Sequence, residues 1–140
     1  GNKAAVERAN ELCKAAGAKR ALPLPVSVPS HCALMKPAAA QLATDLAAMN
    51  FSEPTVAVVN NVDVVVAADA AAIKDALVRQ LYSPVRWTET IEWLSAQGVT
   101  QVVEIGAGKV LNGLVKRINR ELEVSSVNDL ASFKAAFAAE

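Results

Sequence analysis

The sequence has few of the residues that mark several common kinds of site. Its 140 residues include a single histidine, two cysteines and 4% aromatic residues, and the formal net charge is zero. No nucleic-acid partner is indicated, because neutralising phosphates requires a basic excess. The two cysteines, Cys13 and Cys32, lack the spacing of a zinc site, and we expect both to stay reduced in the cytosol.

Long apolar runs are lacking as well. No stretch approaches the ~20 residues of a membrane helix, and no signal peptide is visible, so we expect a cytoplasmic protein with no membrane partner. Apolar residues nevertheless make up 53% of the chain, enough for one core. The first residue is glycine rather than methionine, which suggests a fragment or a processed chain.

Helical and strand-like patterns alternate along the chain. Helical spacing predicts helices over 3–16, 37–49, 70–82, 87–97, 110–122 and 130–137. Short apolar runs predict strands over 21–28, 56–59, 101–105 and 124–127. Asp69 and Asp129 are placed to cap the helices that follow them. This alternation with short links indicates the α/β class with a mainly parallel sheet.

The only histidine, His31, follows the apolar segment 22–28 and the helix-breaking Pro29. A side chain at the end of a strand is held by the sheet yet accessible, which favours a catalytic role. Imidazole exchanges protons near neutrality, so His31 is a candidate general base. The alternative is a surface or core histidine held by one hydrogen bond.

The loop Gly106-Ala107-Gly108-Lys109 lies between a predicted strand and a predicted helix. It suggests an anion cradle at a helix N-terminus, and hence a non-catalytic α/β binding module. The detailed pattern differs from nucleotide motifs, since Val110 replaces the Ser or Thr of a P-loop. A tight strand-to-helix turn is the simpler interpretation.

Three patches together resemble one family. They are Ser27-Val28-Pro29-Ser30-His31 with the 34–38 segment, residues 75–87 with their Pro-Val-x-Trp turn, and Val103–Leu111 with its Glu-x-Gly-x-Gly-Lys-Val-Leu loop. They resemble the malonyl-CoA:acyl-carrier-protein transacylases (the FabD type). The resemblance implies that residues 1–28 are the remainder of a small ferredoxin-like subdomain. Residues 29–140 then form the C-terminal part of a large α/β-hydrolase-like acyltransferase subdomain.

The resemblance also implies a chemistry. In that family a serine in Gly-His-Ser-Leu-Gly attacks malonyl-CoA and passes the malonyl group to acyl carrier protein in fatty acid synthesis, with no metal or redox cofactor. Its activating histidine corresponds to His31, and the residue whose backbone carbonyl orients that histidine corresponds to Gln80. This chain has no Gly-x-Ser-x-Gly. We therefore expect it to be inactive alone and to need a missing N-terminal half that carries the serine. An acyltransferase of the same fold with another acyl group is a further alternative.

Overall fold

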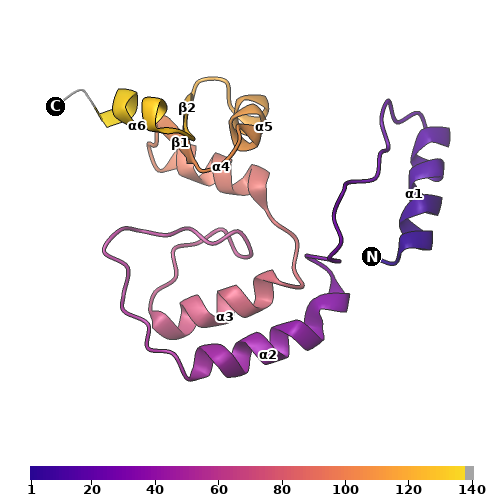
Figure 1. The fold of residues 1–140 in the computed structure, drawn as a ribbon, viewed down its shortest axis with the longest axis horizontal. Helices are drawn as coiled ribbons and strands as arrows, with labels where there is room; N and C mark the ends of the chain where they lie inside the picture. The colour runs from indigo at the N-terminus through magenta and orange to yellow at the C-terminus, as the bar shows by residue number, and fades with distance from the viewer. Residues whose placement is uncertain (138–140) are drawn as a thin grey trace. The chain divides into compact units, whose positions relative to one another are not determined.

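The chain divides into two units, Gly1–Val85 and Arg86–Glu140, in a computed structural model that describes residues 1–137. The first unit contains α1 (Lys3–Ala15), the 3-10 turn η1 (Ala33–Met35), α2 (Lys36–Ala47) and α3 (Ala70–Gln80) (Figure 1). The second contains α4 (Trp87–Ala96), β1 (Gln101–Ile105), α5 (Val110–Ile118), β2 (Glu123–Val127) and α6 (Leu130–Phe137). All six predicted helices and two of the four predicted strands are confirmed.

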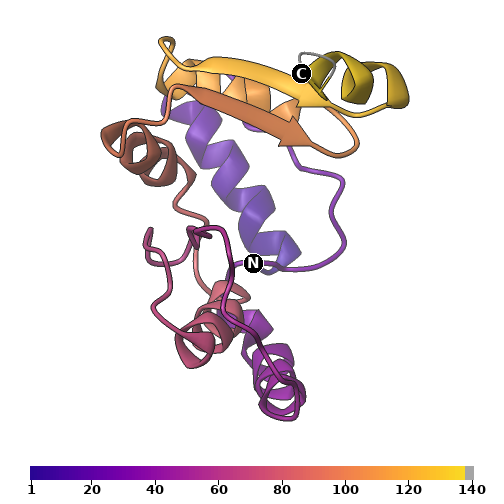
Figure 2. The same ribbon diagram turned by 90° about the vertical axis from the view of Figure 1, so that its left-hand side faces the viewer.

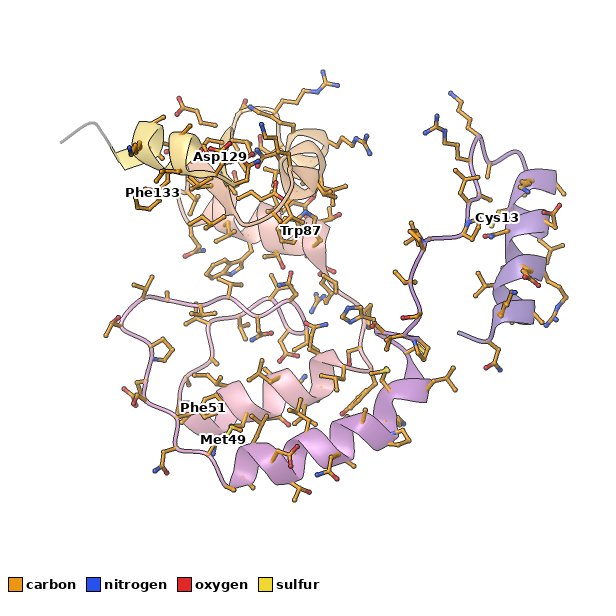
Figure 3. The ribbon with its side chains drawn as sticks, in the orientation of Figure 1. Cys13, Met49, Phe51, Trp87, Asp129 and Phe133 are labelled. Carbon is orange, nitrogen blue, oxygen red and sulfur yellow. The ribbon has the colours of Figure 1, made fainter. Side chains whose placement is uncertain are left out.

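Helices α2 and α3 pack against each other in the first unit (Figure 1). Pro37 lies in the first turn of α2, where its lack of an N–H costs no hydrogen bond. Asp69 caps α3, as predicted, by accepting a 2.8 Å hydrogen bond from the amide of Ala72. The link between the two helices holds Met49 and Phe51 (Figure 3). Lys74 of α3 donates to the Met49 carbonyl at 2.6 Å, so the link is tied to the helix.

The two strands predicted in the first unit do not form. Residues 21–28 have no regular structure, and Leu22, Leu24 and Val26 are 68%, 75% and 72% exposed. Pro23 and Pro25 remove two backbone donors, and the described residues offer this segment no partner strand, so the alternation alone cannot build a ladder. The 56–59 prediction was also wrong, since that segment makes only one antiparallel bridge, Val59 to Val66.

The second unit is a β–α–β arrangement with a parallel sheet, as the sequence predicts. β1 and β2 pair in register from Gln101 with Glu123 to Ile105 with Val127, and Figure 2 shows the two arrows side by side. The core beneath them is formed by Ile91, Val115 and Leu122. Within α5 Val115 is fully buried, whereas Leu111 and Leu114 are exposed.

The observed fold class is therefore α/β with a parallel sheet, as predicted. The proposed split into residues 1–28 and 29–140 concerns subdomains of a longer protein and stays a prediction. No helix within residues 1–137 is long and apolar enough to cross a membrane.

Candidate active site

His31 lies in the short loop that precedes η1, and its backbone has an unusual conformation. Its φ of 60° is in the left-handed region, which few residues other than glycine adopt. The His31 amide donates a 2.9 Å hydrogen bond to the carbonyl of Leu81, just past the end of α3. This hydrogen bond offsets the strain of the backbone. It holds the loop where the exposed His31 side chain contacts the C-terminal end of α3.

The His31 ring meets two main-chain carbonyls through one nitrogen. Nδ1 is 3.0 Å from the Gln80 oxygen and 3.1 Å from the Ser83 oxygen. A carbonyl can only accept a hydrogen bond, so Nδ1 must carry the proton. In the neutral ring the lone pair then lies on Nε2, which is the atom that could take a proton from a nucleophile.

The end of α3 supplies these carbonyls because a helix leaves its last carbonyls without intrahelical partners. The Arg79 carbonyl is taken by the amides of Tyr82 and Ser83, at 3.2 and 3.0 Å. The Gln80 carbonyl is thereby left for the imidazole. The site thus depends on where α3 ends.

His31 and Gln80 are the site residues indicated by the sequence, and the structure brings the ring of His31 to the carbonyl of Gln80. Ser83 is a further member of the site that the sequence did not indicate. The available signal was Ser83-Pro84, because a proline just after a helix prevents its continuation and leaves carbonyls of the turn unpaired.

An ion pair anchors α3 one residue before Gln80. Arg79 donates to both carboxylate oxygens of Asp63, at 2.8 and 2.6 Å, and to Asp75 at 2.6 Å. The carboxylate of Asp63, and secondarily that of Asp75, raises the pKa of Arg79 above its ordinary value. Because Asp63 lies in the 60–66 turn, the pair ties that turn to the C-terminal end of α3.

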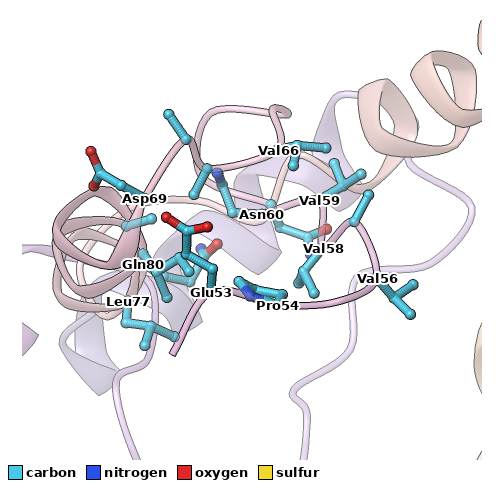
Figure 4. A pocket seen from close by; sticks show the side chains of 16 residues that line it. Glu53, Pro54, Val56, Val58, Val59, Asn60, Val66, Asp69, Leu77 and Gln80 are labelled. Atoms are coloured by element: carbon cyan, nitrogen blue, oxygen red, sulfur yellow. The ribbon is translucent and has the colours of Figure 1, made fainter. Parts of the chain in front are cut away.

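A hollow of about 430 Å³ lies between α3 and the preceding segment 53–69 (Figure 4). Its wall is mostly apolar, with Val56, Val58, Val66 and Leu77 among the lining residues. Gln80 also lines it, so the residue whose carbonyl meets His31 borders an apolar space. Within residues 1–137 no group of three or more His, Cys, Asp or Glu side chains could hold a metal ion.

The glycine loop before α5 is arranged differently from an anion cradle. The Glu104 carboxylate accepts hydrogen bonds from the amides of Leu111 and Asn112, at 3.1 and 2.9 Å. These first-turn amides are the ones that an external phosphate would use. The chain's own carboxylate already occupies the position, which disfavours the binding-module alternative.

No protein-family model matches the chain, but individual proteins match it closely. The "Malonyl CoA-acyl carrier protein transacylase" of Salmonella typhimurium is 65% identical over 136 residues, which are 97% of this chain and 44% of that protein. An acyl carrier protein S-malonyltransferase structure from Vibrio cholerae superposes with a TM-score of 0.92, at 65% identity, over 97% of this chain and 44% of that one. The malonyl-transacylase PlMCAT, solved in complex with the type II PKS acyl-carrier protein AntF (holo), gives a TM-score of 0.96 and 61% identity, over 100% of this chain and 45% of that one.

The fold and these similarities are those of acyltransferases. More narrowly, nearly the whole chain is similar to malonyl CoA-acyl carrier protein transacylases, which confirms the resemblance noted in the sequence. It spans less than half the length of the relatives that it matches.

Proposed function

We propose that this chain is the C-terminal portion of an enzyme that transfers a malonyl group from malonyl-CoA to acyl carrier protein in fatty acid synthesis. The observation that carries the proposal is the His31 ring, held by main-chain carbonyls through Nδ1. High identity to malonyl transacylases over nearly the whole chain supports the same substrate class. Coenzyme A, the carrier's pantetheine thiol and a serine from an N-terminal half are the partners, and no metal or redox cofactor takes part.

His31 acts as the general base in each half of a ping-pong reaction. Nε2 removes the serine proton as the serine oxygen attacks the malonyl thioester carbonyl. The tetrahedral intermediate collapses, the C–S bond breaks, and the imidazolium gives its proton to the departing coenzyme A thiolate. The pantetheine thiol then gives its proton to Nε2 as its sulfur attacks the carbonyl of the seryl ester. The ester C–O bond breaks, and the imidazolium returns the proton to the serine oxygen.

Main-chain carbonyls suit this task because they orient the ring without adding a full negative charge. They hold the proton on Nδ1 in the resting state and stabilise the imidazolium when it forms. In the described part of the chain, the hydrogen bonds of the ring go to main-chain oxygens and none goes to a serine hydroxyl. The chain alone therefore supplies a base but no nucleophile, and we expect it to be inactive.

Complementation tests the proposal. The chain is fused to the N-terminal part of the Salmonella typhimurium relative, and malonyl transfer to acyl carrier protein is followed. His31→Ala should lower kcat about 10²- to 10⁴-fold, the range expected for removing a general base. Cys13→Ala, an exposed position on α1, is the control and should leave the rate unchanged. Activity of His31→Ala within a few-fold of the parent would refute the assigned base.

Mass spectrometry separates this function from the binding-module alternative. The fused protein mixed with malonyl-CoA should gain the mass of one malonyl group. Tight, reversible nucleotide binding with no covalent adduct would support the module instead. An adduct formed more readily from another acyl-CoA would support an acyltransferase of different specificity.

A further inference from the structure

The side chain of Gln80 contacts the same turn that holds His31. Its Nε2 lies 3.3 Å from the Ser83 carbonyl and 3.3 Å from the Pro84 carbonyl. The Ser83 carbonyl also meets His31 Nδ1 at 3.1 Å. Gln80 thus reaches the imidazole by two routes: directly through its own carbonyl, and through its side chain by way of Ser83.

The chemistry of the turn explains why an amide is needed there. Pro84 has no N–H, so its nitrogen cannot anchor the turn through a backbone hydrogen bond. The side-chain amide of Gln80 brings two N–H donors on one atom, and two carbonyl oxygens accept them. A carboxylate of the same shape has no N–H donor, so its oxygens would face the two carbonyl oxygens without a hydrogen bond.

We propose that the Gln80 side chain is a positioning group that fixes the Ser83 carbonyl and thereby holds His31 in the Nδ1-protonated form. Its importance for catalysis rests on the proposed function, but its effect on the ring does not. Substitution at position 80 removes the side-chain route and leaves the backbone carbonyl in place. The two routes can therefore be separated by experiment.

The single histidine makes the ring directly observable. The 140-residue chain is labelled with ¹⁵N-histidine and studied by NMR, alone and mixed with the unlabelled N-terminal part, at a pH where the imidazole is neutral. The parent should show a protonated Nδ1 and an unprotonated Nε2. In Gln80→Met the two ¹⁵N shifts should move toward each other, because a ring that keeps only the Gln80 carbonyl populates the Nε2-protonated tautomer more often.

Gln41→Met is the matched control. Gln41 is also a helical glutamine, but its amide donates to Asp45 within α2 at 3.0 Å. This variant should leave both ring signals where they are in the parent. Circular dichroism establishes that each variant is folded. If Gln80→Met does not fold, Gln80→Glu keeps the shape of the side chain while losing its donors, and should move the two shifts in the same direction.

Two results would overturn the proposal. One is a parent ring that carries its proton on Nε2, or exchanges between tautomers, in both samples. The other is a folded Gln80 variant whose ring signals match those of the parent. A lack of malonyl transfer by the complemented protein would refute the proposed function and leave the tautomer result standing.

The complemented enzyme gives a second measurement. In Gln80→Met we expect kcat to fall roughly 10- to 100-fold, as when the partner that orients a metal-bound histidine is removed. KM for malonyl-CoA should stay within about twofold, because Gln80 acts on the base rather than on the substrate. A rise in KM at unchanged kcat would instead indicate a substrate contact and overturn the positioning role.

Discussion

At the scale of residues, carboxylate side chains accept hydrogen bonds from backbone amides at the N-terminal ends of three helices. Asp69 binds the amide of Ala72 at the start of α3, and Asp129 does the same for Ser132 before α6. Glu104 differs because it reaches the first turn of α5 from β1, seven and eight residues earlier in the chain. These three carboxylates set where helices begin, and α3 in turn sets where the His31 site lies.

Removing the Glu104 carboxylate should destabilise the second unit. Glu104→Ala leaves the amides of Leu111 and Asn112 without their acceptor, at a cost of about 1–2 kcal/mol. Urea denaturation of the full chain measures the change as a lower midpoint with an unchanged slope. Glu92→Ala, at an exposed position of α4, is the control and should change stability by less than about 0.5 kcal/mol. Equal midpoints for the two variants would contradict the capping role.

Asp129 makes the stability of α6 depend on pH. Hydrogen bonds from the Ser132 amide and then from its hydroxyl lower the pKa of Asp129 below its ordinary value. Since the folded pKa is the lower one, this stabilisation is present above the unfolded value and is lost as the pH falls through the folded value. We expect Asp129→Asn to weaken the loss of stability below about pH 4. Urea titrations at pH 7 and pH 3 measure the free energy of unfolding of the parent and the variant. An equal loss of stability in both proteins would contradict the role of Asp129.

At the scale of elements, the sequence predicted well those helices and strands whose hydrogen-bond partners lie nearby in the chain. Helix α3 makes its backbone hydrogen bonds within itself and at its cap, and β1 pairs with β2, which follows after one helix. The segments 21–28 and 56–59 have equally apolar sequences but find no partner strand in the described part of the chain. A strand requires a neighbour for its backbone groups, so apolar alternation is insufficient by itself.

At the scale of the whole molecule, many apolar side chains stay in contact with solvent. On the sheet, Val103 is 46% exposed and Ile105 is 74% exposed, although parallel sheets are normally covered on both faces. Leu24 and Val56 are similarly exposed in the first unit. Under the proposed function, the N-terminal part of the enzyme covers such surfaces.

The chain alone should therefore bind a hydrophobic dye such as anilinonaphthalene sulfonate. The surface available to the dye should shrink when the chain is produced together with the N-terminal part of the relative. We expect at least a severalfold fall in dye fluorescence per mole of chain, measured at equal concentration. A paired sample with an unrelated α/β domain of similar length is the control. Equal fluorescence with both partners would show that these surfaces are not covered by the N-terminal part.

The sequence by itself determined the helices, the parallel pairing of β1 with β2 and the family resemblance, and it indicated His31 as a candidate base. These follow from short-range patterns and from motifs that are read residue by residue. The resemblance implied the Gln80 carbonyl as the partner of His31, but only the tertiary structure showed the contact and added the Ser83 carbonyl, because these partners lie 49 and 52 positions further along the chain. Sequence spacing does not show which backbone oxygens remain unpaired at a helix end. It also does not show that the Gln80 amide donates to the Ser83 and Pro84 carbonyls. That His31 and Gln80 serve catalysis stays a prediction for the experiments above.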